Sequence, residues 1–474
     1  MKKPLLILIM TLVPLMTFAD GTEINGIYYN LVSKTKQAEV TSNPNKYSGS
    51  IVIPATVDYD GITYDVTSIG NRAFIENKDV VSVSIPNSVT NIGENAFGYC
   101  DFTSIIIPNS VTTLAKKAFN NCRKLETITM GTGITSIGPD AFQTCLSIEK
   151  VIVKDLEAWC HISFDDTPFG WNGGHLYSDE NTEITELVIP DGITTINYNT
   201  FRGCKFITSL IIPNSVTTIS DGAFRGCESL TKVEFSSSVT YLSGFNDCTG
   251  LASVTIPNSV TTIGTCAFSG CTSLTSIDIP NSVTTIGLQA FQYLNIKSIT
   301  IPKSVTTIDN DAFLGCSKLA EITIGSGVLT IGDRAFGYCK EITDVYSYPE
   351  QVPQTNATAF DNSLIEYATL HVPEAAINSY KATAPWSGFK EVVAISSSGI
   401  SKLEASETSV KCEGDQLAVE GINDGQIVDV YSLNGEKHGS AVSKNGAARI
   451  DTNVLTGSVV LVKIGNKSVK VIVK

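Results

Sequence analysis

The sequence predicts a β-rich α/β solenoid, a leucine-rich-repeat stack with a parallel sheet and short helical or 3-10 turns, followed by a small C-terminal β-sandwich. Two observations lead to this prediction. A pattern with a period of roughly 21 to 23 residues recurs between positions 51 and 341, and such a period is typical of solenoid repeats. After position 410 this pattern gives way to short alternating strands. A unit this short cannot bury its own apolar face, so its copies must stack on one another.

The composition restricts the partners that the chain can bind. The formal net charge is −14, only 17% of the residues are charged, and no basic run follows residue 3. A protein that binds nucleic acid or acidic lipid through electrostatic attraction needs a basic surface. We therefore expect no nucleic-acid partner.

Residues 1–19 read as a secretory signal peptide. Lys2 and Lys3 precede an apolar run over residues 5–16, and Thr17 and Ala19 are small residues at the two positions that determine cleavage. The alternative is a retained membrane anchor, but the apolar run is shorter than the roughly 20 residues that a membrane span needs. No later segment is apolar enough to cross a membrane, so we expect an exported protein without a span.

The repeats follow an N-terminal segment of a different kind. Residues 20–50 have strand composition with Asn-Gly and Asn-Pro turn signals, and we interpret them as a cap on the first coil. Each repeat over residues 51–341 is marked by a phenylalanine after a small residue, at regular steps with one longer gap between positions 142 and 201. The marker phenylalanines are Phe74, Phe97, Phe119, Phe142, Phe201, Phe224, Phe245, Phe268, Phe291, Phe313 and Phe336.

One coil, residues 274–295, illustrates the prediction. Ile277 and Ile279 alternate with polar residues, which indicates a strand with one buried face. Pro280 ends this strand because it cannot donate to a ladder. Residues 289–292 are expected to form a helical turn or a short 3-10 segment that places Phe291 in the core. The strands of neighbouring coils would then lie in parallel, about 4.8 Å apart.

The repeated pattern I-P-N-S-V-T-x-I-G-x-x-A-F-x-x-C, clearest over residues 256–271, resembles the BspA-like leucine-rich repeats of bacterial surface proteins. The resemblance covers about residues 51–341. It implies a surface-displayed solenoid, with adhesion to matrix proteins and coaggregation as the roles of the family.

The gap between two of the marker phenylalanines holds one enlarged coil, residues 148–183. It contains Trp159, Phe164, Phe169 and Trp171, which predict a compact insertion with a small core of its own. A similar W-C-x-I-x-F element occurs within the family that the repeats resemble, which implies a standard variant of the coil.

Three further segments follow the repeats. Residues 342–395 are interpreted as a C-terminal cap, and residues 396–410 as a flexible linker that begins Ser-Ser-Ser-Gly. Residues 411–474 alternate as short strands and predict the β-sandwich. This domain resembles a type A sorting domain of type IX secretion in residues 430–436 and 463–474. Residues 457–461 lack the usual tyrosine, so a terminal β-domain without a sorting role stays open.

Nine of the twelve cysteines lie three residues after a marker phenylalanine, once per coil. An exported protein raises the expectation of disulfides. However, these positions point into the core, where cysteine acts as a small apolar residue, and Leu294 takes the same position in its own coil. We therefore predict free buried thiols, with Cys266 and Cys271 as the first pair to check for an exception.

The sequence contains no recognisable catalytic or cofactor site. Cys160, His161 and His175 lie in the enlarged coil near Asp165 and Asp166, but four ligands at the spacing of a structural zinc site are missing. We predict that the protein is not an enzyme and needs no metal or other cofactor. The alternative is an enzyme or glycan-processing accessory centred on residues 155–177, which would depend on one of the two histidines.

The remaining candidate is the outward face of the strands, which repeat proteins use to bind extended partners. Serine and threonine dominate it, with a few apolar residues in its first half beside the enlarged coil. The predicted ligand-binding residues are Ser104, Ile106, Lys150, Ile152, Glu186, Val188, Ser209, Ile211, Trp159 and Trp171. We predict a monomeric, adhesin-like protein that binds proteins or glycans of a host matrix or of other microbes. The alternative is a structural coat or spacer without a specific ligand.

Overall fold

The computed structural model describes residues 21–169 and 173–395 and, further on, residues 409–413, 416–420, 422, 424–432, 437–451, 459–464 and 467–472. The predicted signal peptide and most of the predicted linker lie outside the described residues. The chain divides into two compact units. One comprises Met1–Leu370 with Asn378–Val392, and the other comprises His371–Ile377 with Val393–Lys474.

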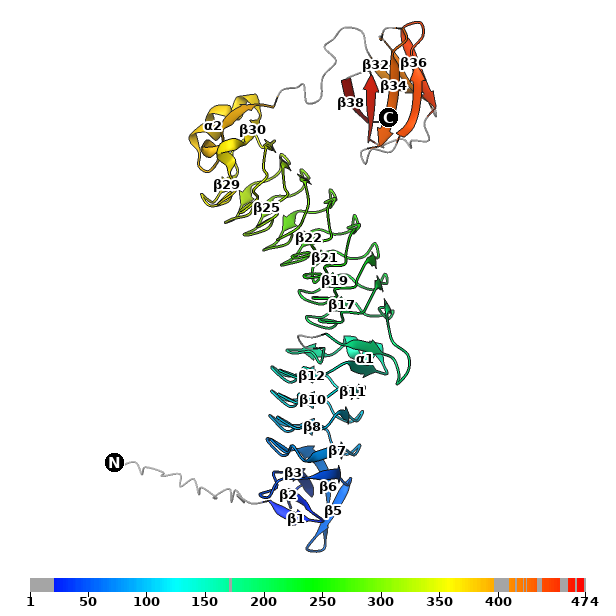
Figure 1. Cartoon of the computed structure of the whole chain (residues 1–474), viewed down its shortest axis with the longest axis vertical. Helices are drawn as coiled ribbons and strands as arrows, with labels where there is room; N and C mark the ends of the chain where they lie inside the picture. The colour runs from blue at the N-terminus through cyan, green and yellow to red at the C-terminus, as the bar shows by residue number, and fades with distance from the viewer. Residues whose placement is uncertain are drawn as a thin grey trace, which may run out of the picture. The chain divides into compact units, whose positions relative to one another are not determined.

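The first unit is the predicted solenoid, a stack of coils with a parallel sheet along one side (Figure 1). We call the strands along this side the first sheet; they pair in separate groups of neighbouring coils. Its strands are β4 (Gly49–Val52), β7 (Val80–Ser84), β9 (Ser104–Ile106), β11 (Thr127–Met130), β13 (Lys150–Val153), β15 (His175–Tyr177), β16 (Glu186–Val188), β18 (Ser209–Ile211), β20 (Lys232–Glu234), β24 (Ser298–Ile301), β26 (Glu321–Ile324), β28 (Asp344–Ser347), β30 (Thr369–Val372) and β31 (Glu391–Ala394).

A second sheet, which the sequence pattern did not reveal, runs along the stack. It is formed mainly by two-residue strands at the Thr-Ile of the repeated T-T-I-G segment, and neighbouring coils pair in parallel there. Its strands are β6 (Ile62–Ile69), β8 (Asn91–Ile92), β10 (Thr113–Leu114), β12 (Ser136–Ile137), β14 (Ser163–Phe164), β17 (Thr195–Ile196), β19 (Thr218–Ile219), β21 (Tyr241–Leu242), β22 (Thr262–Ile263), β23 (Thr285–Ile286), β25 (Thr307–Ile308), β27 (Thr330–Ile331) and β29 (Gln354–Thr355).

The marker phenylalanines form a ladder through the core. Their rings stack between neighbouring coils at centroid distances of 5.1 Å, for Phe74 on Phe97, to 6.0 Å, for Phe268 on Phe291. The ladder continues beyond residue 341, because Phe360 stacks on Phe336 at 5.4 Å. Stacked aromatic rings bury a large apolar area in each coil, so the ladder supplies much of the driving force for stacking.

Residues from the segments predicted as caps cover the two ends of this ladder, and the last coil itself, with Phe360, lies within the predicted C-terminal cap. At the N-terminus, β1 (Thr22–Ile24), β2 (Ile27–Val32) and β3 (Gln37–Val40) form an antiparallel sheet that joins β6, to which β5 (Thr56–Tyr59) also pairs. The Tyr47 ring lies 4.7 Å from Phe74. At the other end, Trp386 and Phe389 lie edge-on to Phe360 at 5.4 and 5.3 Å.

Two details of the predicted coil are wrong. Residues 289–292 form a hydrogen-bonded turn and no helix, because Gln289 (φ 57°) has a left-handed backbone that a right-handed helix excludes. The helices lie instead in the enlarged coil and the C-terminal cap. They are α1 (Leu156–Cys160), α2 (Ile377–Ala382) and the 3-10 helices Ile365–Tyr367, Glu374–Ala376 and Trp386–Gly388.

The second difference concerns the strand predicted around Ile277 and Ile279. Both side chains are buried as expected, but this segment pairs with no neighbour, and the first sheet is interrupted between β20 and β24. The second sheet continues across the same coils through β21, β22 and β23. Apolar alternation therefore identified the buried face correctly. Backbone pairing between strands depends, in addition, on how closely neighbouring coils approach on that side.

The cysteines of the described residues are free, as predicted, and those after the marker phenylalanines are buried. They have a second role that the sequence did not indicate. Most of these thiols donate a hydrogen bond to the backbone oxygen of the phenylalanine one coil earlier, as Cys122 does to Phe97 O at 2.9 Å. In the last coil Ser363 takes the same position and donates to Phe336 O at 2.6 Å. The position thus favours a small donor as well as a small apolar side chain.

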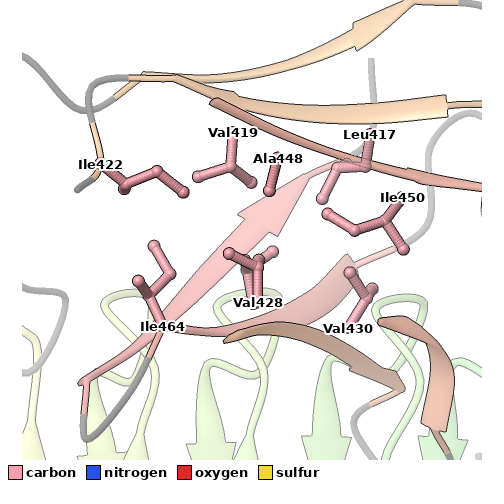
Figure 2. Close-up of a cluster of buried hydrophobic side chains, with 9 residues drawn as sticks. Leu417, Val419, Ile422, Val428, Val430, Ala448, Ile450 and Ile464 are labelled. Carbon is pink, nitrogen blue, oxygen red and sulfur yellow. The ribbon is translucent and has the colours of Figure 1, made fainter. Parts of the chain in front are cut away.

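The second unit contains the small β-domain predicted for the C-terminus. One sheet has the order β32 (Ser409–Glu413), β33 (Gln416–Glu420), β36 (Ala447–Asp451), and the other β35 (Lys437–Val442), β34 (Ile427–Ser432), β37 (Val459–Ile464), β38 (Lys467–Ile472), all antiparallel. Leu417, Val419, Val428 and Ile450 belong to its buried core (Figure 2).

Candidate binding surface

The enlarged coil has the small aromatic core that the sequence predicted. Asp155 caps helix α1 by accepting a hydrogen bond from Ala158 N at 2.9 Å. The helix carries Trp159 inward, where its ring lies 4.9 Å from Phe164 and 6.0 Å from Phe169. A short helix therefore replaces the usual narrow turn and widens the core at this coil.

The prediction that Trp159 contacts a ligand is wrong, because its side chain is fully buried. Its indole Nε1 donates to Thr200 O of the next coil at 3.0 Å. Both sheets are interrupted at this point, since β14 does not pair with β17, nor β15 with β16. Trp159 thus holds the two halves of the stack together. Trp171 lies outside the described residues.

The prediction that Ile152 binds a ligand is also wrong, because only 2% of this residue is exposed. The register of β13 places it beside Tyr177 of β15. After Tyr177 the chain reverses, and Tyr177 forms an antiparallel bridge with Glu183. This hairpin, residues 177–183, covers the outward position of Ile152. It belongs to a later part of the enlarged coil, so the alternation pattern within β13 could not predict that Ile152 is buried.

Polar contacts fix the hairpin against the first sheet. Lys150 Nζ lies 4.3 Å from the centre of the Tyr177 ring and donates to Glu180 O at 2.6 Å. His175 Nδ1 is hydrogen-bonded to Glu183 Oε1. Lys150, which the sequence proposed as a ligand-binding residue, is therefore partly engaged by its own coil.

Beyond the hairpin, two apolar residues lie side by side on the outward face. Strands β16 and β18 pair so that Val188 is opposite Ile211 and Glu186 is opposite Ser209. Val188 is 54% exposed and Ile211 40%. We call Val188, Ile211, Glu186 and Ser209 the β16–β18 patch. Four of the predicted residues are thus brought together.

Ser104 and Ile106 lie apart from this patch. They belong to β9, which pairs with β11 and is followed in the sheet by β13 and β15. Ile106 is 65% exposed and Ser104 is exposed as well. The covered Ile152 separates them from Val188, so the predicted stripe is two separate areas.

The structure adds Phe206 to the neighbourhood of the hairpin. This exposed ring stacks on the His175 imidazole with centroids 3.6 Å apart. A weak signal was present in the sequence, because the corresponding position of the next coil holds Ser229. The predicted residues were those of the outward strand face and the tryptophans of the enlarged coil, and Phe206 belongs to neither group.

Two titratable groups of this region have pKa values shifted by their surroundings. Burial raises the pKa of Cys160 to about 12, so its thiol is protonated at neutral pH. Glu234 raises the pKa of Lys232 through a hydrogen bond on the next strand, β20. Within the described residues, no three His, Cys, Asp or Glu side chains gather where they could hold a metal ion. In the same residues, no helix has the length and apolar character of a membrane span.

The short stacked coils, their parallel sheets and their buried phenylalanine ladder define a leucine-rich-repeat solenoid. A model of the BspA type leucine rich repeat region matches residues 60–167, 177–245 and 242–366. Because these matches cover more than half of the chain, the protein belongs to the BspA-type leucine-rich-repeat family.

Several solved structures are similar to the chain. A leucine-rich repeat protein from Bacteroides ovatus is 22% identical, with 78% of this chain and 99% of that chain covered and a TM-score of 0.39. The pneumococcal vaccine antigen PcpA is 16% identical (79% and 98% covered, TM-score 0.50). A leucine rich cell surface protein from Faecalibacterium prausnitzii is 24% identical (69% and 94% covered, TM-score 0.32). At such identities the likeness concerns the fold alone. No curated protein matches the chain.

Proposed function

We propose that the protein is an exported, surface-displayed binding protein of the adhesin type. It uses the outward face of the first sheet to bind proteins or glycans of a host matrix or of other microbes. Membership of the BspA-type family and the signal-like residues 1–19 support this proposal. The solenoid supports it too, because stacked repeats present a long regular surface to extended partners.

The observation that carries the proposal is the β16–β18 patch. Val188 and Ile211 are exposed and adjacent, on a face that otherwise presents mainly serine, threonine and charged side chains. Contiguous exposed apolar area is a feature of protein interaction sites. The stacked His175–Phe206 pair adds aromatic surface nearby. A partner would cover this apolar area and form hydrogen bonds with the surrounding polar groups.

A pull-down from host extracellular matrix tests the proposal. The protein without residues 1–19 is immobilised beside a V188D/I211D variant and a T300D variant. Thr300 is an exposed residue of β24 on the same face and serves as the matched control. We expect the double variant to lose at least tenfold in retained partner, because two carboxylates would have to be desolvated, while T300D retains it.

The result also separates the alternative role. If the unaltered protein retains no matrix or microbial component, it is a coat or spacer and the proposal fails. If the double variant binds as well as the unaltered protein, the β16–β18 patch is not the site; I106D then tests the exposed area on β9. Unchanged circular dichroism shows in each case that the variant is folded.

We further propose that the C-terminal β-domain directs type IX secretion. Its resemblance to a type A sorting domain in residues 430–436 and 463–474, and a buried core of its own, support this role. Mass spectrometry of the protein recovered from its native cell surface is the test. Loss of residues after 400 is expected if the domain is a cleaved signal. Its presence in the recovered protein would favour a terminal domain without that role.

A further inference from the structure

One coil of the solenoid is shorter than its neighbours. In the preceding coil, Ile219 and Phe224 are separated by Ser-Asp-Gly-Ala, whereas Leu242 and Phe245 are separated only by Ser-Gly. The backbone bonds show where the two residues are missing. Phe224 N donates to Gly244 O at 2.8 Å, as Phe201 N donates to Ala223 O. Gly244 therefore takes the place of the alanine, and the two-residue turn before it is absent.

The local geometry requires this glycine. Gly244 has φ +91°, and a Cβ on it would lie 2.5 Å from Ser220 O. Residue 244 therefore has to be glycine to let the shortened coil pass close under its neighbour. The side chain of Tyr241 extends into the vacated region, where its Oη donates to Asp221 Oδ1 at 3.0 Å.

A hollow of about 300 Å³ lies at this place, lined by Tyr198, Ser220, Asp221 and Tyr241. These residues lie in or directly after β17, β19 and β21 of the second sheet (Figure 1). The hollow therefore belongs to a different face from the β16–β18 patch. The hollow is shallow and largely open to solvent.

The lining has two aromatic rings with a carboxylate between them. Tyr198 is 54% exposed, and its ring lies over Gly222, where a Cβ would be 3.5 Å from Tyr198 Cε2. Tyr241 belongs to the second coil after that of Tyr198, which corresponds to about 10 Å along the stack. Among the hydrogen bonds of the described residues, that from Tyr241 engages Asp221 Oδ1 and none engages Oδ2.

We propose that this hollow is a binding site for a neutral pyranose sugar. The face of a tyrosine ring carries partial negative charge and attracts the C–H groups on the apolar face of a pyranose. The free Oδ2 of Asp221 accepts a hydrogen bond from a sugar hydroxyl, and the Ser220 hydroxyl offers a further donor or acceptor. The combination of aromatic faces and hydroxyl-binding groups in an open hollow fits a ring that is apolar on its faces and polar at its edge.

A cationic ligand is the main competing occupant, since tyrosine faces and a carboxylate also attract ammonium groups. One feature favours the neutral sugar. Asp221 already accepts a hydrogen bond from Tyr241, which spreads its negative charge.

Saturation-transfer difference NMR tests this site, with methyl β-galactoside, N-acetylglucosamine and cellobiose as probes and tetramethylammonium as the cationic probe. The protein without residues 1–19 is compared with Y198A and D221N. Y293A is the matched control, because Tyr293 is also 54% exposed and does not line the hollow. Tyr198 is largely exposed, so Y198A is expected to fold.

We expect saturation transfer to the ring C–H protons of at least one sugar, weakened at least fivefold by Y198A and D221N and unchanged by Y293A. Transfer to none of the three sugars, or equal transfer in Y198A, would overturn the proposal. So would binding of tetramethylammonium alone. The site is independent of the proposed adhesin function: V188D/I211D should leave sugar binding intact, so the failure of one proposal is distinguishable from the failure of the other.

Discussion

The indole Nε1 of Trp159 donates a hydrogen bond to the backbone oxygen of Thr200 across the only place where both sheets of the described solenoid are interrupted. Asn197 Nδ2 adds a second link to Cys160 O at 3.3 Å. Elsewhere in the stack, neighbouring coils are held by backbone ladders and by the phenylalanine stack. At the enlarged coil, side chains take over that role.

Replacing Trp159 with phenylalanine is therefore expected to weaken the stack. The change leaves a buried carbonyl at Thr200 without its donor, which costs about 1–3 kcal/mol. The free energy of unfolding, measured by urea titration, should fall by this amount. Y198A removes an exposed ring one coil further on and serves as the control, with an expected change within about 0.5 kcal/mol. Equal stability of W159F and the unaltered protein would contradict the structural role of the indole.

Ile106 and Ile152 provide a matched test of the covered face. Both occupy the same outward column, since each is opposite Thr129 in the strand register. Ile152→Ala should destabilise the protein by about 2–5 kcal/mol, because Ile152 is buried beside the hairpin. Ile106→Ala should change the stability by about 0.5 kcal/mol or less. Urea titrations of the two variants measure the difference. Equal effects would mean that the hairpin does not cover β13.

The cysteines are expected to confer no redox sensitivity on the stability of the solenoid. Every cysteine among the described residues is free, so adding a reductant should leave the melting temperature of a C412S variant unchanged. The C412S background removes the one cysteine whose side chain lies outside the described residues. A drop in melting temperature on reduction would reveal a disulfide and contradict this arrangement.

The same C412S protein should show selective thiol labelling. Burial raises the pKa of Cys316 to about 12, and the pKa of Cys271 lies well above its usual range for the same reason. Cys266 is only partly buried; its pKa is raised by burial and then by Asp221. Because the thiolate is the reactive form, iodoacetamide should modify Cys266 first, faster as the pH rises. Peptide mass spectrometry measures the order, and labelling of Cys271 before Cys266 in the folded protein would contradict it.

The phenylalanine ladder should dominate the stability of each coil. Phe291→Ala removes a ring stacked between Phe268 and Phe313 and should cost about 3–5 kcal/mol. Tyr293→Ala, two residues away on the surface, should cost about 0.5 kcal/mol or less. Differential scanning calorimetry of both variants is the measurement. A Phe291→Ala variant as stable as Tyr293→Ala would show that stacking between coils contributes little.

Much of the fold was predictable because each repeat has the same pattern of buried and exposed positions. Phe291, Cys271 and Ile277 were placed in the core from their recurrence, and all three are buried. The same comparison set residues 20–50 and 342–395 apart from the regular coils, although Phe360 and Ser363 form one more coil of the stack. Hydrophobic periodicity indicates which side of a segment is buried, and each further copy of the repeat gives the same indication again.

The candidate binding residues were harder to predict. Val188 and Ile211 are exposed and paired as the alternation implied, whereas Ile152 has the same local pattern and is buried. The difference arises from the hairpin at positions 177–183, which lies well beyond β13 along the chain. Likewise, the hollow at Tyr241 follows from the absence of two residues, which brings side chains of different coils around one space.

The amino-acid sequence by itself determined the solenoid and its core, because hydrophobic periodicity and turn residues act locally and identically in each coil. Only the tertiary structure decided which outward residues are accessible. It also decided where side-chain contacts, instead of backbone hydrogen bonds between strands, hold neighbouring coils together. Those properties depend on contacts between different coils. Trp159 illustrates the division: its aromatic character predicted a small core, and its bond to Thr200 became visible only in the folded chain.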